Sequence, residues 1–190
     1  IEIPVPTKEP AGPVGRPLVV SVGRLVSWKG FDGVIDAVKG ESWHATIVGD
    51  GPLRAKLESL VRESGLSERV RFTGQLPRPE AHGWIKAADV FVLNSTYEGL
   101  SHLLIEAMSL GTPIVATDIA GNREVMTHEK EGLLIPPHDT AALRKAIRET
   151  LADAGATRNR AKAAEERART FAAEQTVRRL AQVLKTICAS

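Results

Sequence analysis

The chain contains 190 residues, of which 43% are hydrophobic and 25% are charged. This composition is typical of a globular domain of ordinary size, and no apolar run is long enough to span a bilayer. The formal net charge of +2 gives no reason to expect a nucleic-acid partner. The single cysteine, Cys188, excludes an internal disulfide and favours a reducing compartment, so we expect a cytoplasmic location.

Residues 1–17 form the first segment, which carries five prolines. It lacks the basic start and apolar core of a signal peptide. Its composition predicts a linker that enters from a missing N-terminal domain, so that residues 18–190 form the domain described by this sequence.

Six short apolar runs then alternate with helical patterns, as in parallel strands joined by crossover helices. The expected strands are residues 18–22, 45–48, 70–73, 90–93, 113–116 and 133–135. The expected helices are residues 31–38, 52–63, 79–88, 103–110 and 140–152, followed by C-terminal helices from about residue 155, one solvated to residue 174 and one amphipathic over 174–187. Because the strands are apolar throughout, both faces of the sheet should be covered. The predicted fold is α/β, with a doubly wound, mostly parallel, six-stranded Rossmann-like sheet.

Ligands of such a sheet bind at the carboxyl ends of strands 1 and 4. The segment after the first strand begins with a glycine turn at Gly23 and carries Arg24 and Lys29 beside a helix start. Free backbone N–H groups and two cations together favour a phosphate or diphosphate. The alternative is that both are ordinary surface cations.

The segment after the fourth strand carries two glutamates, Glu98 in the loop and Glu106 within an apolar helix. A carboxylate in an apolar helix needs a hydrogen-bond partner, and the preceding run offers no cation, so the vicinal diol of a ribose is a candidate. The free N–H groups of residues 99–103 would point at a ligand between the two glutamates. The alternative is a Glu98 favoured by the helix dipole and a solvated Glu106.

Other ligand classes lack their sequence signals. No Gly-x-Gly-x-x-Gly follows the first strand, as a dinucleotide site would require, and there is no Gly-x4-Gly-Lys-Ser/Thr loop. The chain has no Asp-x-Asp pair and no Cys/His cluster, and Asp50 is isolated, so we predict no metal.

Five motifs occur in a fixed order along the chain. They are Gly-Arg-x4-Lys-Gly at 23–30, Val-Gly-Asp-Gly-Pro-Leu at 48–53, Val-x-Phe-Thr-Gly at 70–74, Glu-x7-Glu at 98–106 and Gly-Thr-Pro-Ile-Val-Ala at 111–116. From about Leu18 to Thr150 the sequence resembles the C-terminal, donor-binding domain of retaining GT-B glycosyltransferases of the group 1 or family 4 type, which includes phosphatidylinositol mannosyltransferases and sucrose synthases.

The resemblance implies a role for each motif residue. Arg24 and Lys29 would hold the donor's diphosphate, Glu98 would contact the transferred sugar, and Glu106 would bind the ribose hydroxyls. The remaining implied donor contacts are Gly23 in the turn, Gly49 and Gly51 for close approach of the chain, Phe72, Thr73, Gly74 and Gln75 against the nucleobase, and the backbone of Gly99, Leu100, Ser101, His102 and Leu103 over the sugar and β-phosphate.

The resemblance further implies transfer of a sugar from a UDP-sugar or GDP-sugar to an acceptor, with retention of configuration and without a cofactor. The acceptor site would lie on a preceding N-terminal domain, so this chain would be the donor half and inactive alone. Two departures matter: residues 100–102 replace an aromatic and a glycine, which leaves the sugar open, and residues 121–124 replace Gly-x-Pro-Glu, which weakens Glu124 as a candidate.

Two alternatives remain open, a non-catalytic nucleotide-sugar-binding subunit that needs a partner chain and a GT-B-like epimerase. An epimerase would need acid/base groups near the sugar, for which only His102 is available. The basic residues between Arg158 and Arg179 could contact anionic lipid at the cytoplasmic face of a membrane, although interspersed glutamates favour a solvated helix face.

Overall fold

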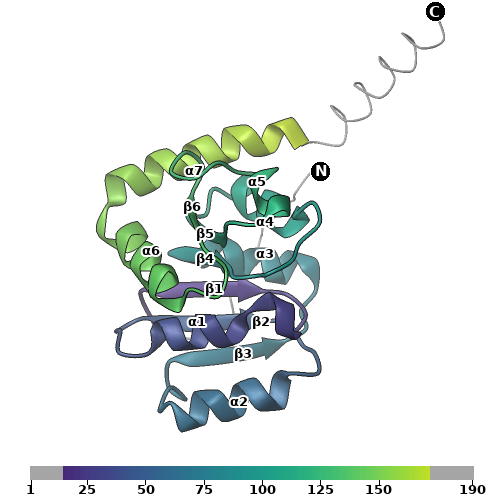
Figure 1. Ribbon diagram of the computed structural model, residues 1–190, viewed down its shortest axis with the longest axis vertical. Helices are drawn as coiled ribbons and strands as arrows, with labels where there is room; N and C mark the ends of the chain where they lie inside the picture. The colour runs from purple at the N-terminus through teal and green to yellow at the C-terminus, as the bar shows by residue number, and fades with distance from the viewer. Residues whose placement is uncertain (1–14, 172–190) are drawn as a thin grey trace, which may run out of the picture.

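The computed structural model describes residues 15–171, which form a single six-stranded sheet surrounded by helices (Figure 1). The strands lie in the order β3-β2-β1-β4-β5-β6, and each neighbouring pair is parallel. Their bounds are β1 Leu18–Val22, β2 His44–Val48, β3 Val70–Gly74, β4 Val90–Leu93, β5 Ile114–Thr117 and β6 Leu133–Ile135. The predicted doubly wound fold is confirmed. The expected linker before residue 15 and the expected helix over 174–187 lie outside the described residues.

Seven α-helices connect and follow the strands within residues 15–171. They are α1 Phe31–Val38, α2 Arg54–Glu63, α3 Arg78–Ala87, α4 His102–Ser109, α5 Ala120–Arg123, α6 Thr140–Ala152 and α7 Ala154–Ala168, with short 3-10 helices η1 Ser27–Lys29 and η2 Arg169–Phe171. Helix α2 begins two residues later than expected, because Pro52 and Leu53 form a turn before it. The four-residue α5 was not predicted, since it is too short to show a helical period.

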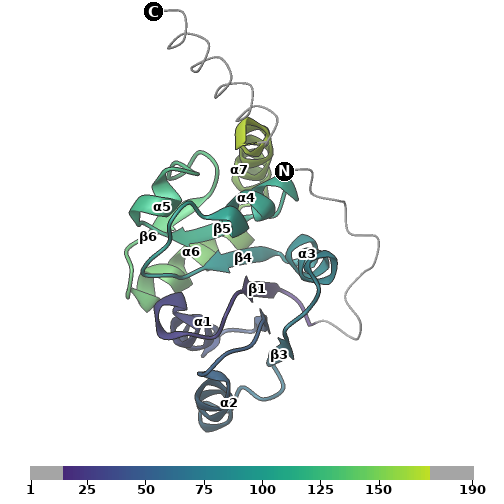
Figure 2. The same cartoon turned by 90° about the vertical axis from the view of Figure 1, so that its right-hand side faces the viewer.

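Helices cover both faces of the sheet (Figures 1 and 2). On one face α1, α2 and α6 pack in a cluster that contains Val19 and Val92. On the other face α3 and α4 cover the neighbouring strand residues Val20 and Phe91. Because successive strand side chains point to opposite faces and both faces are covered, most strands are apolar. The edge strand β3 departs from the expected pattern, because its Arg71 is exposed and its Thr73 is only partly buried.

Helix α7 packs across α4 and is less solvated than its composition predicts. Its side chains Thr157, Ala164 and Ala168 are buried, and Ala164 and Ala168 belong to the same core cluster as α4. The Arg167 guanidinium donates hydrogen bonds to the carbonyls of Val125 and Glu124. The small alanine side chains on one side of α7 therefore allow close contact with α4. The Arg and Glu residues of α7 give no sign of this contact in the sequence. Within residues 15–171, no helix combines the length and apolarity that crossing a bilayer requires.

Candidate functional site

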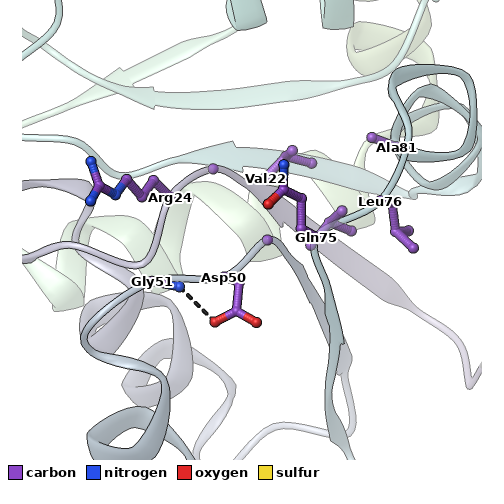
Figure 3. A pocket seen from close by; sticks show the side chains of 10 residues that line it. Val22, Arg24, Asp50, Gly51, Gln75, Leu76 and Ala81 are labelled. Carbon is purple, nitrogen blue, oxygen red and sulfur yellow. Dashed lines mark hydrogen bonds between the residues drawn. The ribbon is translucent and has the colours of Figure 1, made fainter.

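A cavity of about 470 Å³ opens at the carboxyl ends of β1 and β2 (Figure 3). The turn after β3 and the first half of α3 complete it. Its lining residues are Val22, Gly23, Arg24, Val48, Gly49, Asp50, Gly51, Gln75, Leu76 and Ala81. The volume lies in the range of small-molecule sites, and the position beside the switch between β1 and β4 is where ligands of doubly wound sheets bind.

Glycines shape the wall of this cavity where the strand ends meet. Gly23 N donates to Val48 O at 2.9 Å, and Gly49 N donates to Gly74 O at 2.8 Å, so backbone hydrogen bonds join the ends of β1, β2 and β3. A Cβ on Gly49 would lie 2.0 Å from Gly23 O, and Gly49 has a φ of +138°. A Cβ on Gly51 would lie 2.7 Å from Leu25 N. These two positions therefore have no room for a side chain, and the cavity wall is backbone there.

Arg24 is an exposed cation at one end of this lining. Figure 3 shows its side chain at the end opposite to Leu76 and Ala81. Among residues 15–171 it has no hydrogen-bond or ion-pair partner. A guanidinium whose five N–H donors are unused can bind an anion without first breaking a contact within the protein.

Lys29 and Glu98 join the loops that follow β1 and β4. Lys29 Nζ lies 2.6 Å from Glu98 Oε1, and the two side chains are 18% and 16% exposed. Asn94 Nδ2 donates to Gly30 O at 2.8 Å and holds the same two loops together. The Lys29 stem also runs beside Gly23, in the cavity wall. The groups assigned by the resemblance to the diphosphate and to the sugar are thus in direct contact with each other.

Glu106 is 8% exposed and finds its partners on α3 rather than in its own helix. Its Oε2 lies 3.0 Å from His82 Nε2, and its Oε1 accepts a hydrogen bond from Arg78. The expected need for a partner is met within the chain by two residues of α3, which lie outside the run that directly precedes Glu106. Arg78 and His82 are four residues apart, a spacing that places them on one face of a helix and could have revealed the pair. Glu106 does not line the cavity, but Ala81, beside His82, does.

Phe72 does not line the cavity, and its expected place beside a nucleobase stays a prediction. The ring packs against the cluster that contains α2, with the Arg54 guanidinium 4.9 Å from its centroid. The alternation of side chains along β3 places Phe72 on the face of the sheet opposite the cavity. Gln75 and Leu76, which follow the strand, line the cavity instead. The Gly74 carbonyl accepts hydrogen bonds from the N–H of Gly49 and, at 2.9 Å, from the Thr73 hydroxyl.

The loop before α4 presents backbone to the same edge of the sheet. Ser101 is buried, whereas Gly99, Leu100 and His102 are exposed and Leu103 is half-buried. Ser101 provides no side-chain cap, but the N–H of His102 donates to Leu100 O at 2.9 Å, so the expectation that all N–H groups of residues 99–103 are free is wrong for His102.

Helix α5 packs closely against the loop before α4. A Cβ on Gly121 would lie 1.9 Å from Gly99 O, so only a glycine allows α5 this close to the loop. Asn122 is fully buried and donates to Thr117 O at 2.9 Å. At its end, the Arg123 guanidinium donates to the Asp118 carboxylate and holds the pKa of that carboxyl below its ordinary value.

The Asp118–Arg123 pair predicts an acid-dependent loss of stability. A carboxyl whose pKa is lowered in the folded state adds stability above its unfolded pKa and loses it as pH falls through the folded pKa. We expect Asp118→Asn to lower the free energy of unfolding slightly and evenly over about pH 5 to 8. The difference from the parent chain should disappear in stronger acid. Urea unfolding across this pH range measures it, and a difference that grew with acidity would contradict the assignment.

Within residues 15–171 no three His, Cys, Asp or Glu side chains gather in a way that could hold a metal ion. The residues that line the cavity offer the Arg24 cation, the Asp50 carboxylate and the backbone groups of three glycines. Together they can bind an anionic ligand that also carries hydroxyl groups.

Comparison with known proteins identifies the family. The model of the family "Glycosyl transferases group 1" matches residues 7–170. The lipopolysaccharide core biosynthesis glycosyltransferase LpsD of Rhizobium meliloti is 42% identical over 149 residues, which cover 73% of this chain and 43% of LpsD. The 2-deoxystreptamine N-acetyl-D-glucosaminyltransferase of Streptomyces fradiae is 35% identical over 151 residues, which cover 75% of this chain and 35% of that enzyme. The chain thus spans less than half the length of these relatives.

Solved structures show the same fold. HepE of Anabaena in complex with UDP superposes with a TM-score of 0.83 at 27% identity, over 90% of this chain and 49% of HepE. The sucrose-phosphate synthase of Thermosynechococcus elongatus also has a TM-score of 0.83, at 33% identity, over 91% of this chain and 46% of that chain. Fold, motif order and family model agree, and the chain belongs to the group 1 glycosyl transferases.

Proposed function

We propose that this chain is the donor-binding domain of a glycosyltransferase that moves a sugar from a nucleotide diphosphate sugar to an acceptor with retention of configuration. The observation that carries the proposal is an unpaired Arg24 side chain that lines a glycine-rich cavity at the carboxyl ends of β1 and β2. An anionic ligand with a flat or narrow end fits a site in which glycines replace side chains. The complex of HepE with UDP supports a UDP-sugar as the first donor to test and a GDP-sugar as the second.

The proposed chemistry uses the two cations. When the bond between the sugar and the donor phosphate breaks, negative charge develops on the leaving diphosphate while the sugar becomes positively charged. Arg24 and Lys29 would stabilise this developing charge, in place of a metal ion. Lys29 can contact the diphosphate without losing its hydrogen bond to Glu98, because an ammonium group has three N–H donors and Glu98 Oε1 accepts from only one of them.

In this scheme Glu98 contacts two groups, the Lys29 ammonium group and the sugar of the donor. Its Oε1 accepts from Lys29, which leaves Oε2 available to a sugar hydroxyl. The loop backbone at Gly99 would lie beside the sugar, and Gly121 of α5 keeps this loop in place by its close contact. We assign the acceptor site to an N-terminal domain of the same enzyme, at the cytoplasmic side of a membrane or in the cytoplasm.

The first test is binding of nucleotides to this chain by titration calorimetry. We expect UDP to bind at least about tenfold more tightly than uridine, because a charge-assisted hydrogen bond to a phosphate contributes about 1.5–3 kcal/mol. GDP and guanosine form the second pair. Equal affinities for nucleotide and nucleoside, or no binding of either diphosphate, would contradict the proposal.

Transfer itself is tested by adding the remaining domain. The chain alone is expected to bind donor without transferring sugar, and the complete enzyme is expected to transfer. Donor binding without transfer in the complete enzyme would instead favour a non-catalytic subunit, and a change of the donor sugar's own configuration would favour an epimerase.

A further inference from the structure

Glu106 has one oxygen held from inside the protein and one held by an exposed side chain. His82, which contacts Oε2, is 2% exposed. Arg78, which contacts Oε1, has a side chain that is 61% exposed. A carboxylate oxygen can only accept, so His82 Nε2 is the donor of the buried hydrogen bond. The two contacts therefore differ in kind: one is shielded from water and the other can exchange with it.

The element that carries His82 is fixed against the end of α4. Lys86 Nζ donates to Leu110 O at 2.7 Å, and the Thr112 hydroxyl donates to Ile85 O at 3.0 Å. These contacts bind the second half of α3 to the residues that follow α4. A buried imidazole on a helix held in this way cannot move without disturbing both helices, so Oε2 has a fixed position.

No other role of His82 is apparent from its surroundings. Its Nδ1 is buried and has no hydrogen-bond partner among the described residues, so its polar contact is to Glu106 alone. An apolar side chain of similar size would fill the same space, but it would leave Glu106 Oε2 without its buried donor. Since the imidazole makes one hydrogen bond and leaves one nitrogen unsatisfied, it is not explained by packing.

We propose that His82 is a positioning residue that holds one oxygen of Glu106 so that the other faces the ribose hydroxyls of the bound nucleotide. This inference rests on the proposed function. Arg78 occupies the second oxygen as an exposed, weakly held partner that the diol replaces. Ala81, adjacent to His82, lines the cavity, so α3 contributes both to the cavity wall and to the contact with Glu106.

The test compares each nucleotide with its analogue that lacks the diol. Calorimetry of the full chain with UDP and 2′,3′-dideoxy-UDP, or with the guanosine pair if GDP binds, gives two dissociation constants whose ratio measures the diol contact. The parent chain is expected to prefer UDP by about tenfold or more. His82→Leu should lower the affinity for UDP about tenfold and leave the affinity for the dideoxy analogue unchanged, so that the preference is lost.

Two variants separate positioning from general damage. His82→Gln keeps a donor and is expected to restore most of the preference, whereas Ile85→Val, a cavity-forming change on the same helix, is expected to keep it fully. Arg78→Met removes the partner that the diol has to displace, so it is expected to strengthen the preference. The ratio does not depend on the folded fraction, so a destabilised variant still reports.

Each outcome decides the matter. Loss of the preference in His82→Leu with rescue in His82→Gln supports the assignment. An unchanged preference in His82→Leu overturns it and leaves the proposed function standing, because nucleotide binding is still observed. A preference lost equally in Ile85→Val assigns His82 a merely structural role. A parent chain that binds neither UDP nor GDP overturns the proposed function and the positioning role together.

Discussion

Replacing Arg24 by alanine in the complete transferase is expected to lower kcat by about 10²–10³, with a smaller effect on KM. The magnitude is that of removing one donor that stabilises charge in a transition state. Arg24 has no partner among the described residues, so its removal breaks no internal contact and leaves the fold undisturbed. The change in rate therefore reports the lost contact with the leaving diphosphate alone. Steady-state kinetics with the donor varied at saturating acceptor measures it.

Lys29→Met is the companion change and is expected to have an effect of the same order. It also leaves Glu98 without its 2.6 Å partner, so part of its effect would come from a displaced carboxylate. Arg148→Ala is the matched control: it removes an exposed cation that pairs with Glu41, on the face of α6 and away from the cavity. Full turnover in both Arg24→Ala and Lys29→Met would exclude the diphosphate assignment.

Gly49→Ala is the second change with a large expected effect. Its Cβ would lie 2.0 Å from the carbonyl oxygen of Gly23, backbone that cannot rotate away, and its φ of +138° disfavours any side chain. We expect the free energy of unfolding to fall by about 3–5 kcal/mol, because β1 and β2 must separate at the cavity wall. Nucleotide affinity should fall as well, since the same hydrogen bonds shape the site.

Gly40→Ala separates backbone strain from steric conflict. Gly40 also has a positive φ, +81°, but a Cβ there would meet no atom within 4 Å. Its substitution should cost only the strain, about 1–2 kcal/mol, and should leave nucleotide affinity unchanged. Urea unfolding of the two variants gives the difference. Equal losses of stability would mean that the contact between Gly49 and Gly23 is not a constraint on the fold.

The sequence by itself determined the fold and led to the prediction of where the candidate site lies. Apolar runs of three to five residues between helical patterns identified all six strands within one residue at each end, because parallel strands covered on both faces tend to have continuous hydrophobic sequences. Glycines at 23, 49 and 51 and the cation at Arg24 follow strands directly, so their position at the carboxyl edge followed from strand order alone. These features depend on residues close together in the chain.

The tertiary structure decided which groups contact one another. It paired Glu106 with His82, 24 residues earlier, and Lys29 with Glu98, 69 residues later, contacts that no local pattern contains. It placed Phe72 on the face opposite the cavity, because an apolar strand does not reveal which of its alternating side chains faces which layer. Local periodicity follows from backbone geometry and can be read along the chain, whereas pairing between distant residues arises only when helices and strands pack.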